Sequence, residues 1–231
     1  MHKIRPHKLF TVVKSASYLD RMVQVVLPDK ETPVFFDTAI LLALAKLIRP
    51  RTIFEFGTYI GAQTLNLAVN FPQARIYTLD LDQKAVEGSG RGEAADLRTR
   101  FGKQEREVLI HLESQNRLAF LNTPYENGIV RLYGDSNKYD FSGLANQMDI
   151  VYIDGGHDQV TFDSDTKNAL QIVSQNHPAC IAWHDCGNPA YPHIMNRLDQ
   201  LSETRDLFYI EESWTAFLLE DCSDLVERLK H

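Results

Sequence analysis

The sequence predicts one α/β domain over residues 1–231, with a doubly wound sheet of seven mostly parallel strands and a C-terminal antiparallel hairpin strand. Three observations support this fold class. From residue 52 onward, short apolar runs alternate with segments of helical periodicity, a glycine-bearing turn follows the first run, and an acidic residue ends the second. A chain of 231 residues suits a single hydrophobic core, and 44% hydrophobic with 24% charged residues is an ordinary globular composition.

The N-terminal part predicts a cap followed by a helix, not a separate domain. Residues 1–33 mix basic and apolar side chains, and their stretch 18–27 could pack on a second copy of the chain, which suggests a homodimer. Residues 36–48 place apolar side chains at helical spacing. Pro50 ends this helix, because proline cannot continue the hydrogen-bonding pattern.

The rest of the chain alternates strand and helix patterns. The predicted strands are 52–56, 75–81, 129–133, 148–153, 180–183, 207–210 and 214–219, and the predicted helices are 62–70, 163–174 and 194–201. This alternation favours a parallel sheet with helices on both faces. Only residues 211–213 separate the last two strands, so these strands predict a hairpin at the edge of the sheet.

Residues 88–127 lie between the second and third predicted strands and are longer than one crossover requires. We interpret them as an insertion. Two roles stay open for this segment, namely part of a lid or a solvated excursion on the surface.

Charge and composition exclude several classes of partner. A formal net charge of −7 argues against nucleic-acid binding, which needs a basic face. Three irregularly spaced cysteines predict neither a disulfide framework nor a zinc cluster. No apolar run approaches the ~20 residues of a membrane span, and the N-terminus lacks the pattern of a signal peptide. We expect a cytoplasmic protein that binds no membrane.

A glycine-bearing loop follows the first strand, with the pattern Glu55-x-Gly57-x-x-x-Gly61. Glycine lets the backbone turn tightly and approach a ligand, and the loop leads into a helix N-terminus, where dinucleotide enzymes bind a pyrophosphate. The acid departs from that pattern. Glu55 would repel a pyrophosphate, but it could help to order a site for the cationic amino-acid end of a ligand.

Acidic residues also end the next two strands. Asp80 comes about 20 residues after Gly61, the spacing at which a carboxylate can bind both hydroxyls of a ribose. Asp135 and Ser136 follow the third strand and would lie beside the same crevice, where an adenine could lie. A simple turn also explains Asp135 and Ser136, since both residue types are common in turns.

The fourth and fifth strands each end in an Asp/His pair. Asp154 and His157 follow one strand, and His184 and Asp185 follow the other. Asp154, His184 and Asp185 could share a divalent ion; oxygen ligands favour magnesium or manganese, and His184 also allows a transition metal. His157 could accept a proton near neutral pH. A structural role for each histidine stays open.

Together these residues resemble the class I S-adenosylmethionine-dependent methyltransferases, which have a Rossmann-like fold, over about residues 52–219. The runs FEFGTYIGAQT, YGDS, DIVYIDGGH and WHD are similar to those of macrocin-type sugar O-methyltransferases and cephalosporin-hydroxylase-like methyltransferases. The order of the motifs is also similar to that of catechol O-methyltransferase.

The resemblance implies a role for each candidate residue. The cofactor residues would be Glu55, Gly57, Thr58, Tyr59, Gly61 and Thr64 around S-adenosylmethionine, Asp80 at its ribose, Asp135 and Ser136 at its adenine, and Asp154 near both cofactor and metal. His157 would be the general base, and Asp185 with His184 would complete the metal site. Relatives that bind magnesium tend to have a second acid or an amide where this chain has His184.

The implied reaction is direct methyl transfer to a small-molecule acceptor, with a hydroxyl oxygen as the nucleophile. The sulfonium carbon is already electrophilic, so the enzyme must mainly align the two reactants. A divalent metal could bind the acceptor oxygen and lower its pKa, and His157 could remove the proton.

Four alternatives stay open. A nicotinamide-dependent oxidoreductase would also use an acid such as Asp80 to bind a ribose. The chain lacks the Gly-x-Gly-x-x-Gly pattern of such enzymes, however, and Glu55 speaks against a pyrophosphate at the loop. A nucleic-acid methyltransferase that methylates amino groups would carry an Asn/Asp-Pro-Pro-aromatic motif after the fourth strand. Fragments 122–125 and 188–191 lack the second proline of this motif, and neither follows the fourth strand. The last two alternatives are a non-catalytic cofactor-binding protein and an enzyme that uses the same cofactor in another reaction.

Overall fold

The computed structural model of the chain describes residues 1–15, 35–81 and 118–231. The strands are β1 (His2–Ile4), β2 (Thr52–Phe56), β3 (Arg75–Asp80), β4 (Ile129–Tyr133), β5 (Ile150–Ile153), β6 (Ala179–Trp183), β7 (Leu207–Ile210) and β8 (Ala216–Glu220). The helices are α1 (Pro6–Ser15), α2 (Phe35–Ile48), α3 (Ala62–Asn70), α7 (Gln159–Ile172), α8 (Pro192–Leu201) and α9 (Ser223–Lys230), with short 3-10 helices η1 (Glu126–Gly128) and η2 (Ser142–Leu144).

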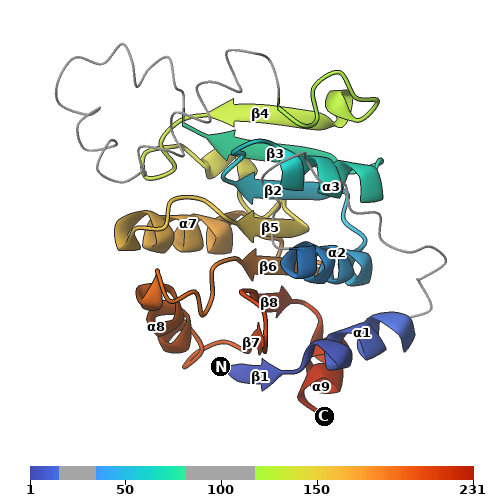
Figure 1. The fold of residues 1–231 in the computed structure, drawn as a ribbon, viewed down its shortest axis with the longest axis vertical. Coiled ribbons are helices and arrows are strands. Elements are labelled where there is room, and N and C mark those ends of the chain that lie inside the picture. Colours follow the sequence, from blue (N-terminus) through green and yellow to red (C-terminus); the bar gives the residue numbers. More distant parts are fainter. Residues whose placement is uncertain (16–34, 82–117) are drawn as a thin grey trace.

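The strands form one mixed sheet of eight in the order β1-β7-β8-β6-β5-β2-β3-β4 (Figure 1). Strands β2 to β6 are parallel, and β8 runs antiparallel to both β6 and β7. The predicted mostly parallel α/β sheet with a C-terminal hairpin is therefore confirmed. The chain runs from β2 outward to β4 and then returns to β5 on the other side of β2, so the order reverses between β2 and β5. In open α/β sheets, ligands bind at the carboxyl ends of the strands at such a point.

The sheet has one strand more than the seven predicted. Residues His2–Ile4 form β1, which pairs in parallel with Phe208–Ile210 of β7. Three residues are too few to show a strand periodicity in the sequence. The strand is recognised only because it pairs with the edge of β7. Residues 1–15 thus extend the sheet and its helix layer as β1 and α1.

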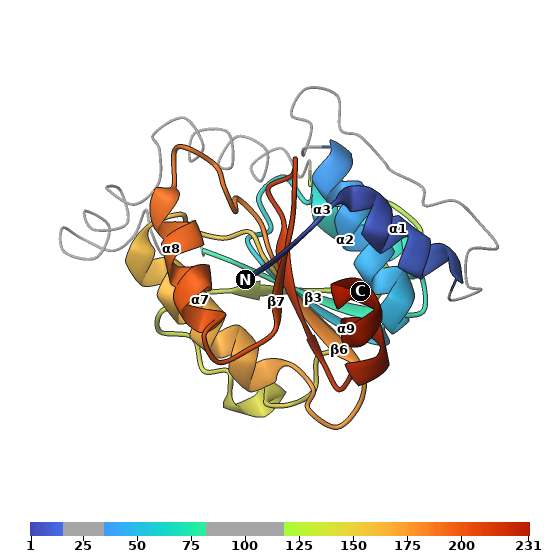
Figure 2. The ribbon, with the colours of Figure 1, turned by 90° about the horizontal axis from the view of Figure 1, so that it is seen from below.

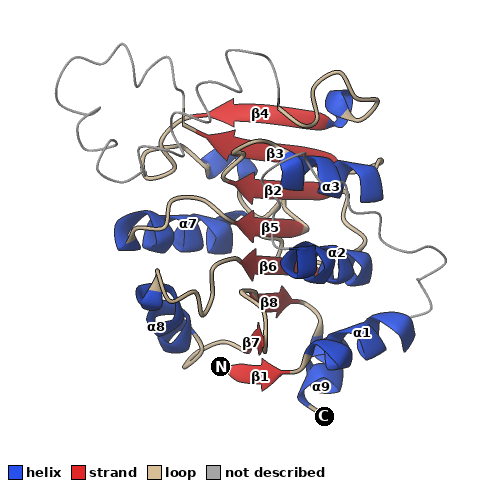
Figure 3. Cartoon of the chain, in the orientation of Figure 1, coloured by secondary structure: helices blue, strands red, loops and turns tan. Residues whose placement is uncertain are grey.

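Helices cover both faces of the sheet. Helices α1, α2, α3 and α9 lie on one face, and α7 and α8 lie on the other (Figures 2 and 3). The central strands are buried on both sides, and alternate residues of β5 contribute to the two cores: Ile150 and Tyr152 to one, Val151 and Ile153 to the other. Burial on both faces explains why this strand is a continuous apolar run in the sequence.

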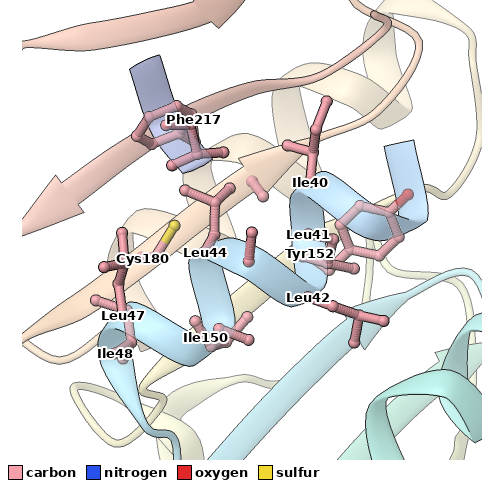
Figure 4. Packing of buried hydrophobic residues seen from close by; sticks show 14 of the residues in the cluster. Ile40, Leu41, Leu42, Leu44, Leu47, Ile48, Ile150, Tyr152, Cys180 and Phe217 are labelled. Carbon is pink, nitrogen blue, oxygen red and sulfur yellow. The ribbon is translucent and has the colours of Figure 1, made fainter. Parts of the chain in front are cut away.

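Helix α2 is buried around most of its circumference and agrees with the predicted helix 36–48. Its apolar side chains, such as Ile40 and Leu44, pack toward Tyr152 and Cys180 of the central strands (Figure 4). A helix in such a layer needs apolar residues on more than one face. A carboxylate in its first turn, Asp37, is also buried.

Helix α7 begins at Gln159, four residues before the predicted start at 163. Asp158 caps it: its Oδ1 accepts hydrogen bonds from the backbone N–H groups of Val160 (3.0 Å) and Thr161 (3.1 Å). This cap satisfies two N–H groups that the helix leaves without partners.

Two predictions fall mainly on residues outside the described ranges. The apolar stretch 18–27 lies wholly outside them, and so does most of the predicted insertion 88–127. The homodimer and the lid therefore stay predictions. Within the described ranges, no helix combines the length and apolarity that crossing a bilayer requires.

Candidate active site

The glycine loop packs directly on the end of β5. Gly57 has a φ of 90°, and a Cβ atom there would lie 2.1 Å from the backbone oxygen of Asp154. Gly61 has a φ of 73°, and a Cβ atom there would lie 2.6 Å from the ring of Phe120. Both positions require glycine for backbone conformation and for space. The loop after β2 and the loop after β5 are therefore in contact, as the two predicted halves of the site require.

Asp80 braces the glycine loop. Its Oδ2 accepts hydrogen bonds from the backbone N–H groups of Thr58 (3.1 Å) and Tyr59 (2.8 Å), and its Oδ1 accepts one from Leu81 (2.8 Å). Burial raises the pKa of Asp80, although these three N–H groups lower it. In this structure Asp80 thus orders the loop beside which a ribose would bind. Its contact with the ribose itself stays a prediction.

Glu55 lies beneath the loop and is fully buried. Its Oε2 accepts hydrogen bonds from the hydroxyls of Thr64 (2.5 Å) and Thr78 (2.7 Å), and the hydroxyl of Thr78 also lies 2.7 Å from that of Thr58. Burial raises the pKa of Glu55 to about 8. The predicted cofactor residues Glu55 and Thr64 therefore connect β2, β3 and α3 behind the loop. A direct cofactor contact of either residue stays a prediction.

The end of β4 lies next to the end of β3. The backbone N–H of Gly134 donates to the carbonyl of Asp80 (2.9 Å), so Asp135 and Ser136 follow immediately beside it. Asp135 Oδ1 accepts hydrogen bonds from the backbone N–H (3.0 Å) and the side-chain amide (2.9 Å) of Asn137. The structure thus brings the predicted ribose and adenine residues to adjacent strand ends.

Sequence analysis missed Asp165, which lies under the loop after β5. Asp165 is 1% exposed, and a Cβ atom on Gly155 would lie 2.9 Å from its Oδ2. Burial raises the pKa of Asp165 to about 7, against the lowering effect of a hydrogen bond with Ser136. The close approach explains why Gly155 is needed. A lone acid within a helix offers no sequence signal for such a position.

The two Asp/His pairs converge at the carboxyl ends of β5 and β6. One ligand atom from each of Asp154, His157 and Asp185 lies within 4.8 Å of the others. His157 Nε2 is 2.7 Å from Asp185 Oδ2. His184 Nδ1 is 3.2 Å from Asp154 Oδ1 and 3.4 Å from Asp185 Oδ2. The structure therefore brings together all four residues. The three whose ligand atoms meet the spacing of a metal site are Asp154, His157 and Asp185, whereas the predicted ligand His184 lies beside this group, near both carboxylates.

The loop between β6 and α8 supports this cluster. Asp185 adopts a left-handed backbone with a φ of 57°, and its Oδ1 accepts a hydrogen bond from the amide of Asn188 (2.7 Å). The ring of Tyr191 stacks on that of His157, with centroids 4.3 Å apart, and His193 Nε2 lies 2.8 Å from the His157 carbonyl. In the sequence, residues 188–191 resemble only an incomplete motif of nucleic-acid methyltransferases. Their role in supporting Asp185 and His157 depends on tertiary contacts.

Charge balance in the cluster is set by its carboxylates. Burial lowers the pKa of His184, but Asp154, Asp185 and Asp37 together raise that pKa well above its ordinary value. Burial likewise raises the pKa of Asp185, but the short contact with His157 and the nearby imidazole of His184 hold this pKa far below its usual range. The carboxylates around His184 therefore favour a positive charge at this position, on the imidazole or on a bound cation.

The donor set fits a divalent cation. Carboxylate oxygens and imidazole nitrogens are both common metal ligands, and imidazole shifts preference from magnesium toward manganese and later transition metals. His184 Nδ1 is buried and, among the described residues, has no hydrogen-bond partner, although two carboxylate oxygens lie near it. A cation would supply the partner that this nitrogen lacks.

Comparison with known proteins identifies the family. Residues 54–186 match the family model of a methyltransferase domain. The chain belongs to this methyltransferase family. The resemblance to class I S-adenosylmethionine-dependent methyltransferases is thereby confirmed, whereas the macrocin-type subgroup stays a prediction. No curated protein matches the sequence of this methyltransferase.

Solved structures agree with this family. The methyltransferase is similar to SAH-bound PaMTH1 of Podospora anserina, at 14% identity and a TM-score of 0.50 over 93% of this chain and 88% of that one. It is similar to CalS11, a TDP-rhamnose 3'-O-methyltransferase of calicheamicin biosynthesis, at 17% identity. The TM-score is 0.51, and the match covers 92% of this chain and 91% of that one. It is also similar to spermidine synthase of Thermotoga maritima, at 10% identity. The TM-score is 0.50, and the match covers 85% of this chain and 62% of that one. At these identities the likeness shows the fold alone.

Proposed function

We propose that this methyltransferase transfers the methyl group of S-adenosylmethionine to a hydroxyl oxygen of a small-molecule acceptor, with the help of a divalent metal. One observation carries the proposal. The Asp154–His157–Asp185 cluster lies directly beside the glycine loop, because Gly57 packs on the backbone of Asp154. A cofactor bound at the loop would therefore present its methyl group to an acceptor held at the cluster.

The cofactor part rests on the loop, on the strand ends beside it and on the family. The loop from Gly57 to Gly61 would approach the methionine end of the cofactor, and Asp80 and Asp135 lie along the direction in which its ribose and adenine would extend. The SAH-bound state of PaMTH1, which shares the fold, supports the same cofactor class. Membership in a methyltransferase family argues against the nicotinamide alternative.

The metal part rests on the donor set. Asp154, His184 and Asp185 would hold the ion, which supplies a Lewis acid that lowers the pKa of an acceptor hydroxyl. Asp185 also contacts His157, so one carboxylate would connect the metal site to the proton acceptor. Magnesium and manganese were predicted from the oxygen ligands; the imidazole of His184 favours manganese of the two.

His157 would act as the general base. Its Nε2 contacts Asp185, its ring stacks on Tyr191 and its carbonyl contacts His193. A histidine oriented by a carboxylate in this way is a suitable proton acceptor. In the proposed step the acceptor oxygen forms a bond to the methyl carbon, the carbon–sulfur bond breaks with its electrons going to sulfur, and His157 takes the hydroxyl proton.

The acceptor class rests on the cluster and on similar enzymes. A polar site with a general base suits a hydroxyl, and CalS11 is named as an O-methyltransferase of such a group on a sugar nucleotide, TDP-rhamnose. A spermidine synthase has a similar fold, so the fold alone does not decide the reaction. Cytoplasmic location and a homodimer through residues 18–27 stay predictions of the sequence.

A labelled-cofactor experiment tests the proposal. S-adenosylmethionine with a radioactive methyl group is incubated with Mn²⁺ and with hydroxyl acceptors such as sugar nucleotides and catechols, and calorimetry measures cofactor binding separately. We expect His157→Gln to keep cofactor binding and to lower methyl transfer by about 10²- to 10⁴-fold. His7→Gln, at an exposed histidine of α1, is the matched control and should behave as wild type. Absence of binding by S-adenosylmethionine and by its demethylated product would refute the proposed function.

A further inference from the structure

Helix α2 contributes a buried carboxylate to the neighbourhood of the cluster. Asp37, in the first turn of α2, is 4% exposed and lies outside residues 54–186 that match the family model. Its Oδ1 accepts hydrogen bonds from the backbone N–H of Trp214 and the hydroxyl of Thr215, both at 2.9 Å. Its Oδ2 is buried, lacks a hydrogen-bond partner among the described residues and lies 3.7 Å from His184 Nε2.

The imidazole of His184 therefore has carboxylates on both sides. Its Nδ1 faces Asp154 and Asp185, and its Nε2 faces Asp37. The ring of Trp214 also lies edge-on to it, with centroids 6.1 Å apart and an interplanar angle of 66°. Asp37 therefore lies near His184 and also accepts a hydrogen bond from the backbone of Trp214, whose ring contacts His184.

This arrangement has a known physical use. A histidine that binds a metal through one nitrogen usually donates the N–H of its other nitrogen to a carboxylate, which sets the tautomer and the orientation of the ring. Here Nδ1, which faces the two cluster carboxylates, has no hydrogen-bond partner among the described residues. The opposite nitrogen, Nε2, faces the Asp37 oxygen that also lacks one, at 3.7 Å.

We infer that Asp37 is a positioning residue of the metal site: it holds the proton of His184 on Nε2 and so directs the lone pair of Nδ1 toward a cation bound with Asp154 and Asp185. The inference rests on the metal part of the proposed function. It extends the site to α2, and it gives a role to the buried Oδ2 of Asp37, which the hydrogen bonds of Oδ1 to Trp214 and Thr215 leave unexplained. A buried carboxylate is costly unless it is paired.

Metal affinity tests the inference without an activity assay. The free Mn²⁺ signal in electron paramagnetic resonance gives the affinity of wild type, Asp37→Asn and Thr215→Val. We expect Asp37→Asn to weaken Mn²⁺ binding by about 10- to 100-fold, the usual effect of losing an outer carboxylate. Thr215→Val is the matched control, because it removes a hydrogen bond to Asp37 Oδ1 and leaves Oδ2 facing His184; its affinity should stay close to that of wild type. Calorimetry should show unchanged S-adenosylmethionine binding in both variants.

A measurement on the wild-type chain covers the case in which Asp37→Asn does not fold. With Zn²⁺ bound, ¹⁵N NMR of the imidazoles, with His184→Gln to assign the signal, should show a metal-bound Nδ1 and a protonated Nε2 in His184. The opposite tautomer would overturn the inference, and so would equal Mn²⁺ affinity in wild type and Asp37→Asn, while the proposed function would stand. If wild type binds S-adenosylmethionine but neither metal, the inference and the metal part of the proposed function both fail, and the cofactor part stands.

Discussion

Single residues in this site are constrained by backbone atoms of neighbouring loops. Gly57 is the clearest example, because its φ of 90° and its contact with the carbonyl of Asp154 each exclude a side chain. Glycine was predicted there for close approach to a ligand. The structure adds a second reason, which is the packing of the β2 loop on the β5 loop.

We predict that Gly57→Ala weakens S-adenosylmethionine binding by more than about 10-fold and lowers the free energy of unfolding by about 1–3 kcal/mol, since the backbone must shift to accept the methyl group. Calorimetry and urea denaturation measure the two effects. Gly143→Ala is the control: among the described residues no heavy atom lies within 4 Å of a Cβ atom placed there, and the backbone has no positive φ. Equal cofactor affinity in Gly57→Ala and wild type would show that the loop does not form the cofactor site.

At the scale of elements, the loop between β6 and α8 is the part that turns two strand ends into a site. It places Asn188 on Asp185 and Tyr191 on His157, while α8 adds the contact of His193. Sequence analysis assigned none of these three residues to the site, because an amide, an aromatic ring and a histidine have many ordinary roles.

We predict that Tyr191→Ala lowers kcat/KM for methyl transfer by about 10- to 100-fold, because the unstacked ring of His157 loses its alignment. The same substitution should leave S-adenosylmethionine affinity unchanged. Tyr191→Phe keeps the stacked ring and should retain most of the activity. Steady-state kinetics with saturating cofactor makes the comparison. If Phe and Ala reduce activity equally, the hydroxyl of Tyr191 matters and the stacking does not.

At the scale of the whole molecule, two buried carboxyls make stability depend on pH. Burial raises the pKa of Glu55 from 4.5 to about 8 and that of Asp165 from 3.8 to about 7. Between the unfolded and the folded pKa, unfolding releases a proton from each group. The free energy of unfolding therefore falls as the pH rises from about 5 to about 8, and the loss is complete above the folded pKa.

We predict that Glu55→Gln removes much of this pH dependence, because an amide cannot ionise and still accepts hydrogen bonds from Thr64 and Thr78. Relative to wild type, the variant should gain stability between pH 5.5 and 8.5, on the order of a few kcal/mol. Urea denaturation at both pH values measures the change, with Glu203→Gln at an exposed site as the control. A wild-type stability that does not fall over this range would contradict the burial effect.

The sequence by itself determined the α/β class, the mostly parallel direction of the central strands and the positions of Asp80, Asp154, His157 and Asp185 at strand ends. Such information is local: periodicity assigns each strand, and the carboxyl ends of parallel strands meet at one edge of the sheet. The same reasoning predicted the helix 36–48, but it treated that helix only as an apolar layer.

Only the tertiary structure decided which distant groups meet. It revealed β1 through its pairing with β7, Glu55 as a buried brace and Asp165 beneath Gly155. It also brought Asp37 to within 3.7 Å of His184, across 147 positions of the chain (184 − 37). A carboxylate carries no mark in the sequence that distinguishes an exposed position from a buried one, because its partner, its burial and its pKa all depend on residues that folding brings next to it.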